Sequence, residues 1–216
     1  MKTALIALGG KFTIPERVKQ QLEDQFGLTG FDEIIGVDSG CHLLKALGLE
    51  PTHILGDFDS IGNLSEFQSY WQSAQVHTFR AEKDETDAEL AFILANELML
   101  ERLIILGAFG GRVDHMLSVF FMASQKKEVT LIDEWNCVKC FTAPFESHVT
   151  QGASVYVSLV PLTELKGVSL LGFKYPLSQA TIPFASTLGV SNELISDRGK
   201  ITIQSGSGFL IFSRDA

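Results

Sequence analysis

Two aspartates separated by one phenylalanine, Asp57 and Asp59, follow directly on the short apolar run 53–55 and on Gly56. Carboxylates this close repel one another strongly unless a cation lies between them. Proteins often hold Mg²⁺ through one or two such oxygen ligands together with the phosphates of a substrate. The pair therefore indicates a metal and phosphate site, with a simple helix cap as the alternative that stays open.

A second acidic group lies in the segment 83–87, with the sequence KDETD. Asp84 and Asp87 are three residues apart at the predicted start of a helix, so both can face one site while Thr86 or Asp84 caps the helix. The positive end of that helix favours an anion. Lys83 could bind a phosphate oxygen or remain a solvated surface lysine.

A glycine-rich connection, residues 107–115, carries the remaining charged candidates. Gly110 and Gly111 would let backbone N–H groups approach an oxyanion, although the order of residues matches neither the Walker A motif nor the dinucleotide fingerprint. Arg112 has a forked donor set suited to phosphate. Asp114 could bind the metal through its carboxylate or orient Arg112. His115 could be a second phosphate donor, but a packed helix residue is the preferred interpretation.

Another glycine turn, Gly9-Gly10-Lys11, follows the first aliphatic run. It could be a further phosphate turn, but a plain connecting loop is the favoured interpretation.

The composition limits the class of protein. Lys and Arg number 17 and Asp and Glu 26 among 216 residues, so the formal charge is −9. This disfavours non-specific binding to nucleic acid or to an anionic membrane, and a small anionic substrate would need a local positive site and a metal. No apolar run is long enough for a membrane span or a signal peptide, which predicts a cytoplasmic protein.

The cysteines, Cys41, Cys137 and Cys140, are odd in number and do not suggest a disulfide framework. Cys137 and Cys140 have C-x-x-C spacing, but a structural zinc site would need a second pair of ligands, and none follows at a suitable spacing. Structural cysteines are therefore the preferred interpretation.

The first half of the chain must position the candidate residues, and it repeats one pattern: a short aliphatic run, a turn and a helical pattern. The runs are 3–8, 33–37, 53–55, 75–79, 102–106 and 129–132. Such alternation predicts a mostly parallel, doubly wound sheet, whose ligands bind outside the carboxyl ends of the strands. The acidic candidates each follow a predicted strand and would meet at that edge: Asp38, Asp57, Asp59, Asp84, Asp87 and Asp114.

After about residue 134 the helical periodicity almost vanishes. Short alternating segments such as 154–160 and 200–204 are separated by Gly, Pro, Ser and Asn. This pattern predicts an all-β sandwich. We therefore expect an α/β domain over residues 1–135 and a β-sandwich domain over 136–216.

Four motifs, taken in order and spacing, resemble the thiamine pyrophosphokinase family: residues 38–40 (DSG), 56–60 (GDFDS), 83–87 (KDETD) and 110–115 (GGRVDH). Residues 189–193 (GVSNE) resemble the thiamine-contacting segment of the same family. The resemblance implies an enzyme that transfers a pyrophosphoryl group from ATP to the hydroxyl of thiamine and releases AMP. It further implies Mg²⁺ as cofactor and a homodimer with active sites shared between subunits, in which the catalytic α/β domain binds ATP and the β domain binds thiamine.

The resemblance also implies roles for single residues. The magnesium ligands would be Asp57, Asp59 and Asp87, and the catalytic set adds Arg112 and Asp114. The ATP phosphates would be bound by Asp38, Lys83, Asp84, Gly110, Gly111, Arg112 and His115. Ser191 and Asn192 would contact the aminopyrimidine of thiamine. The family stacks an aromatic ring on thiamine, and here the candidates are Phe173, Tyr175 and Phe184.

Two alternatives stay open. A pyrophosphokinase acting on a pterin alcohol would use the same fold and chemistry. A non-catalytic module that binds thiamine or nucleotide would have no need for the full set of acidic residues.

Overall fold

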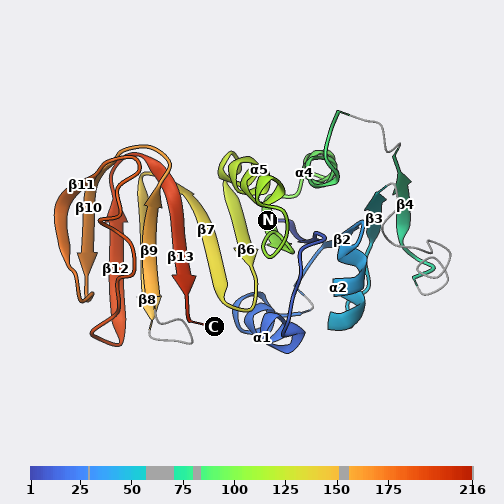
Figure 1. The fold of residues 1–216 in the computed structure, drawn as a ribbon, viewed down its shortest axis with the longest axis horizontal. Helices are drawn as coiled ribbons and strands as arrows, with labels where there is room; N and C mark the ends of the chain where they lie inside the picture. Colours follow the sequence, from blue (N-terminus) through green and yellow to red (C-terminus); the bar gives the residue numbers. More distant parts are fainter. Residues whose placement is uncertain (29, 57–70, 80–83, 151–155, 216) are drawn as a thin grey trace. The chain divides into compact units, whose positions relative to one another are not determined.

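The computed structural model describes residues 1–28, 30–56, 71–79, 84–150 and 156–215 (Figure 1). Asp57, Asp59 and Lys83 lie outside the described residues. The chain divides into two compact units, which are described separately. The N-terminal unit comprises Met1–Ala123 and Leu131–Glu134, and the C-terminal unit comprises Ser124–Thr130 and Trp135–Ala216. The strand β6 (Glu128–Ile132) contributes residues to both.

The N-terminal unit is built on parallel strands. They are β1 (Thr3–Ala7), β2 (Glu33–Val37), β3 (His53–Gly56), β4 (Gln75–Thr78) and β5 (Arg102–Leu106). Their order is β4-β3-β2-β1-β5, and every neighbouring pair is parallel. Every residue of β1 is buried, as expected for a central strand that is covered on both faces.

Helices cover both faces of this sheet. They are α1 (Pro15–Phe26), α2 (Gly40–Leu47), α4 (Asp87–Glu97) and α5 (Val113–Ser124). The chain runs outward from β1 to β4 and then returns to place β5 on the other side of β1, so right-handed crossovers put the first and second helix pairs on opposite faces. Figure 1 shows α1 and α2 on one side of the strands and α4 and α5 on the other. The prediction of a doubly wound sheet is confirmed.

The strand order reverses between β1 and β5, which is where doubly wound folds form a ligand crevice. The two loops that leave these strands are joined by backbone hydrogen bonds, from Leu8 N to Leu106 O (2.8 Å) and from Gly10 N to Gly107 O (3.0 Å). Gly107 has φ +72°, and a Cβ there would lie 2.0 Å from Leu8 O. Only glycine permits this close approach of the two loops.

The C-terminal unit consists of antiparallel strands. They are β7 (Asn136–Thr142), β8 (Phe145–Thr150), β9 (Tyr156–Pro161), β10 (Leu165–Leu171), β11 (Leu177–Ile182), β12 (Arg198–Ile203) and β13 (Ser207–Ser213). One layer has the order β7-β13-β9 and the other β11-β10-β12-β8. Buried side chains from both layers form one core, including Phe141, Leu159, Leu210, Val168 and Ile201. This face-to-face packing confirms the predicted β sandwich.

The burial of the cysteines agrees with a structural role. All three lie in the described part of the chain, are buried and carry reduced thiols. Burial raises the pKa of Cys41 and of Cys140 to about 12, which keeps these thiols protonated and unreactive near neutral pH. In the part of the chain that the structure describes, no helix has the length and apolar character needed to cross a membrane.

A chain of polar side chains ties the edge strand β4 to its neighbours. Glu33 Oε2 on β2 lies 3.3 Å from Nε2 of the buried His53 on β3, and His53 Nδ1 lies 3.0 Å from His77 Nε2 on β4. In this contact one ring nitrogen donates a proton and the other accepts it. The hydrogen bond is therefore lost when both rings are imidazolium. Burial is the main cause that lowers the pKa of His53, and His77 lowers it further, against the opposing effect of Glu33.

This contact predicts a pH-dependent stability. Because the pKa of His53 is lowered on folding, the unfolded chain takes up a proton that the folded chain refuses, and stability falls as the pH drops below about 6.5. His77→Phe is expected to cost about 1–2 kcal/mol at pH 7.5, since it leaves a buried ring nitrogen unpaired, and to flatten that fall. Urea unfolding between pH 5 and 8 measures both. His148→Phe, at an exposed histidine, is the control, and an unchanged pH slope in His77→Phe would refute the prediction.

Candidate active site

A cavity of about 310 Å³ lies at the carboxyl ends of β1, β2 and β5, in the N-terminal unit. Its walls come from the loops after these strands and from the first turns of α4 and α5. The residues that line it are Leu8, Gly9, Gly10, Val37, Asp38, Ser39, Thr86, Asp87, Ala88, Gly107, Ala108, Phe109, Gly111, Arg112, His115, Met116 and Val119. The cavity therefore occupies the place where the strand order reverses.

Two carboxylates line the cavity from different elements. Asp38 directly follows β2 in a left-handed conformation (φ +48°), which aspartate tolerates better than most residues, and its N–H donates to Leu55 O at 2.7 Å. Gly56 (φ +153°) packs against it, because a Cβ there would lie 3.3 Å from the Asp38 Cβ. Gly56, at the end of β3, therefore lies beside Asp38.

Asp87 is the first residue of α4. Thr86 caps this helix, since its Oγ1 accepts a hydrogen bond from Glu89 N at 3.2 Å. Asp87 therefore lies at the positive end of the helix dipole, with its side chain in the cavity wall. Asp84 is exposed and does not line the cavity, so the structure separates the two aspartates of this segment.

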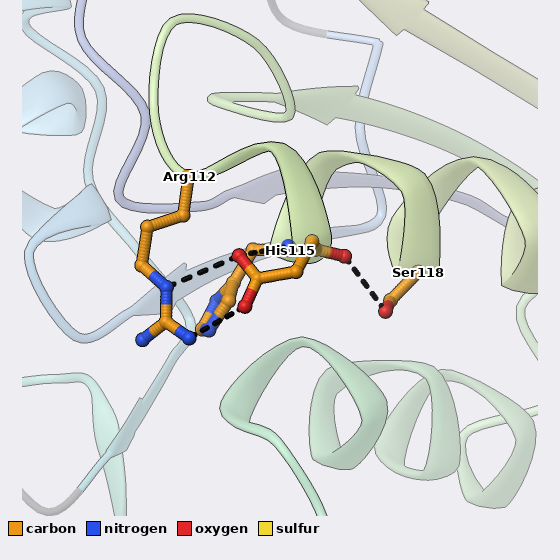
Figure 2. Close-up of polar contacts among 4 residues, drawn as sticks. Arg112, His115 and Ser118 are labelled. Atoms are coloured by element: carbon orange, nitrogen blue, oxygen red, sulfur yellow. Dashed lines mark hydrogen bonds and ion pairs between the residues drawn. The ribbon is translucent and has the colours of Figure 1, made fainter.

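Arg112 and Asp114 form a two-pronged ion pair at the start of α5 (Figure 2). Arg112 Nε donates to Asp114 Oδ1 at 3.1 Å, and a terminal nitrogen of Arg112 donates to Oδ2 at 2.6 Å. The hydrogen bond from Arg112 lowers the pKa of Asp114 to about 2, with a further contribution from His115 N–H. Of the two roles expected for Asp114, the structure displays the one that orients Arg112.

The pair remains open to solvent, with side chains 72% and 62% exposed. Exposed ion pairs contribute little to folding, so this pair leaves the guanidinium accessible at little cost to stability. His115 is exposed and lines the cavity. Its preferred interpretation as a packed helix residue was wrong, because His115 lies in the wall of the cavity and is not buried against the sheet.

The glycine turns line the same cavity. Gly111 is in the wall, and Gly110 (φ +73°) packs on the backbone of Lys11, whose oxygen would lie 2.9 Å from a Cβ at Gly110. Gly9 and Gly10 also line the cavity, although the sequence favoured a plain connecting loop for them. Gly9 and Gly10 directly follow β1, which lies beside the point where the strand order reverses. This position could have indicated that they belong to the site.

Other lining residues were given no role by the sequence. Ser39 lies within the motif 38–40, and Phe109, Met116 and Val119 provide apolar wall. Apolar side chains such as these show no sign of a site in the sequence, and only their packing brings them to the cavity.

The donor set of the cavity suits a hard cation. Asp38 and Asp87 offer carboxylate oxygens from two elements, which are ligands that Mg²⁺ prefers. Within the described ranges, no three His, Cys, Asp or Glu side chains gather as a complete metal site. Asp57 and Asp59 fall outside those ranges.

The predicted thiamine segment lies in the C-terminal unit. Ser191 is exposed and left-handed (φ +57°), and its N–H donates to Ser158 Oγ at 2.9 Å. Asn192 is only 4% exposed, its Oδ1 accepts from Tyr175 N (3.0 Å), and its Nδ2 donates to Tyr175 O (2.8 Å). The Asn192 side chain therefore holds the backbone of Tyr175 in this structure.

The aromatic candidates separate by burial. Phe173 belongs to the core of the sandwich, whereas Tyr175 and Phe184 are 58% and 67% exposed. Core packing excludes Phe173 as a ring that stacks on a ligand, and the other two stay available.

Comparison with known proteins identifies similar sequences over most of the chain. The family model "Thiamin pyrophosphokinase, catalytic domain" matches residues 28–132, and "Thiamin pyrophosphokinase, vitamin B1 binding domain" matches residues 146–210. The thiamine pyrophosphokinase of Bacillus subtilis (strain 168) is 34% identical over 222 residues, covering 100% of both chains.

Solved structures show the same likeness. A crystal structure of thiamine pyrophosphokinase from Bacillus subtilis superposes with a TM-score of 0.84 at 32% identity and covers 100% of both chains. One from Geobacillus thermodenitrificans gives 0.79 at 30% identity, covering 100% of this chain and 99% of that chain. The thiamin pyrophosphokinase of Candida albicans, at 16% identity, gives 0.71 over 99% of this chain and 89% of that one, which is a likeness of fold.

Proposed function

The chain belongs to the thiamine pyrophosphokinase family, and from this we infer that it is an enzyme that transfers the pyrophosphoryl group of ATP to the hydroxyl of thiamine, giving thiamine diphosphate and AMP. The observation that carries this function in the chain itself is the cavity where the strand order reverses. It brings two carboxylates, a forked cation and two glycine turns to one place, which is the equipment that phosphoryl transfer requires.

We propose that ATP binds in this cavity with its phosphates toward Arg112 and the backbone of Gly110 and Gly111. The guanidinium fork matches phosphate oxygens, and Asp114 holds it in one orientation before the nucleotide arrives. His115 lies on the same helix turn and can donate to a further oxygen. Lys83 remains a proposed contributor from the segment before α4, whereas the exposed Asp84 lies away from the cavity wall.

The carboxylates suggest how a metal would be held. Asp38 and Asp87 fit Mg²⁺, and Asp57 and Asp59 are proposed to complete the set. Bound Mg²⁺ would neutralise charge on the transferred diphosphate. The thiamine hydroxyl oxygen forms the new bond to the β-phosphorus, the bond from that phosphorus to the oxygen of AMP breaks, and the hydroxyl proton leaves to a base in the site. Positioning and electrostatics then account for catalysis without a covalent enzyme intermediate.

Thiamine is proposed to contact the segment at Ser191 and Asn192. The Ser191 hydroxyl is exposed and can pair with a ring nitrogen or amino group of the pyrimidine. The side chain of Asn192 holds the backbone of Tyr175, so Asn192 would also fix the position of an exposed aromatic ring. Tyr175 and Phe184 are the remaining candidates for stacking.

Single-turnover product analysis tests the reaction. Purified protein is mixed with Mg²⁺, ATP and thiamine, and the nucleotide and thiamine products are separated and quantified. AMP that forms in step with thiamine diphosphate is the expected result. ADP with thiamine monophosphate would overturn the diphosphotransfer, turnover of a pterin alcohol alone would change the acceptor, and binding without any turnover would indicate a non-catalytic module.

A homodimer is also proposed, and exposed apolar side chains support it. Val113, Leu117 and Phe121 recur every fourth residue on α5, directly after Arg112, and form an exposed stripe. The C-terminal unit exposes another apolar set: Tyr175, Phe184, Leu188, Val190 and Ile195. Exposed apolar sets of this kind are typical of surfaces that a partner covers, and a second copy of the chain offers the complementary set.

The exposed stripe on α5 predicts which substitutions would dissociate the dimer. Leu117→Glu with Phe121→Glu is expected to convert a dimer into a monomer, because each change buries a charge in an apolar interface. Light scattering after gel filtration measures the mass. Met99→Glu, at an exposed methionine after α4, serves as the control and should leave the dimer intact. A monomeric starting protein, or a double variant that stays dimeric, would refute the proposal.

A cytoplasmic location and the absence of nucleic-acid binding remain predictions.

A further inference from the structure

A buried carboxylate at the carboxyl end of β6 contacts the loop between β1 and α1. Glu134 is 5% exposed, and its Oε1 accepts two hydrogen bonds from Thr13, one from the backbone N–H (2.9 Å) and one from the hydroxyl (2.6 Å). The two residues are 121 positions apart in sequence and both belong to the N-terminal unit. Hydrogen bonds to a charged oxygen are about twice as strong as neutral ones, so this is a firm attachment.

Glu134 keeps its charge despite burial. Burial raises the pKa of Glu134, but the hydrogen bonds from Thr13 and the positive charge of Arg17 outweigh it, and the pKa is lowered overall. The carboxylate is therefore ionised near neutral pH and acts as an acceptor only.

The same loop is fixed at its other end. Leu8 and Gly10 donate to the backbone of Leu106 and Gly107, and the backbone of Lys11 packs on Gly110. The turn formed by Gly9, Gly10 and Lys11, whose two glycines line the cavity, therefore contacts the β5 loop on one side and is followed on the other by Thr13, which Glu134 holds. Glu134 itself does not line the cavity.

We propose that Glu134 is a positioning residue for the nucleotide: through Thr13 it holds the turn of Gly9, Gly10 and Lys11 in the cavity wall, although it does not touch the ligand. This inference rests on the proposed function, because it takes the cavity as the site of the ATP phosphates. A tethered turn meets the phosphates without first losing conformational freedom, and a released turn must be ordered when ATP binds. Thiamine is proposed to bind through Ser191 and Asn192, so its binding should be spared.

The test compares Glu134→Gln and Thr13→Val with the unchanged protein. Glutamine keeps the size and removes the charge, and valine removes the hydroxyl donor and keeps the N–H. We expect about a tenfold rise in KM for Mg²⁺-ATP, which is the size of effect that a lost charged hydrogen bond produces, with KM for thiamine within about twofold. Amide hydrogen exchange at residues 9–13 should become faster in both variants, and Thr13→Ser should restore both properties.

Asp32→Asn is the matched control. Asp32 Oδ2 accepts a hydrogen bond from Thr3 N (2.7 Å), which is a similar attachment at the opposite, amino end of β1. It should lower stability without changing KM for ATP. Equal rises in KM for both substrates, the same rise in Asp32→Asn, or unchanged exchange at residues 9–13 would overturn the proposal. Failure of the proposed function is distinguishable, because the unchanged protein would then form no thiamine diphosphate while the exchange measurement still reports on the tether.

Discussion

Replacing Asp87 with asparagine is expected to lower kcat by about a thousandfold, the upper end of what loss of one charge-stabilising group costs an enzyme. Asp87 lies in the cavity wall at the first position of α4. Asparagine keeps the shape of the side chain and its place in the helix, since the cap is made by Thr86. The neutral amide binds Mg²⁺ far less well, and the proposed metal would then neutralise less charge on the transferred diphosphate.

Asp84→Asn is the matched control for this prediction. Asp84 is exposed, three residues before Asp87, and does not line the cavity. Steady-state kinetics with a Mg²⁺ titration should show a raised metal requirement for Asp87→Asn only, while circular dichroism shows both variants folded. Turnover of Asp87→Asn at the level of the unchanged protein would remove this residue from the proposed metal site.

The second large effect is expected for Arg112→Lys, which should lower kcat by about a hundredfold. Lysine keeps the positive charge but is a point donor, so it cannot make the forked contact that the Arg112 side chain already makes with Asp114. The loss should fall on kcat more than on KM for ATP, because charge on the transferred group is most dispersed in the transition state.

Thermal stability distinguishes a catalytic role of Arg112 from a structural one. The Arg112 and Asp114 side chains are largely exposed, so thermal unfolding of Arg112→Lys should match that of the unchanged protein. Asp114→Asn should have a smaller kinetic effect, about tenfold, because Arg112 remains but loses its orientation. Arg198→Lys, at an exposed arginine of the C-terminal unit, is the control. A hundredfold loss in that control, or none in Arg112→Lys, would contradict the proposed role.

Local chemistry explains which parts of the site could be predicted. Thr86 and Asp87 could be predicted because helix starts favour a side-chain acceptor at the cap and a carboxylate in the first turn, and both preferences act within a few residues. The pairing of Arg112 with Asp114 could be predicted because the two residues are two positions apart on one turn. The hydrogen bonds between the Asn192 side chain and the backbone of Tyr175, 17 residues away, could not be predicted, because no local pattern indicates such a contact.

The sequence by itself determined the alternation of strands and helices and the change to short antiparallel strands after β6. It also determined that carboxylates directly follow several strands. These follow from side-chain periodicity and turn chemistry, which depend on neighbours in the chain. Only the tertiary structure decided that Gly9 and Gly10 join the cavity, that Asp84 leaves it, that His115 faces it, and that Glu134 holds Thr13. Each of these depends on which strands become neighbours in the sheet, and that is set by packing between residues about a hundred positions apart.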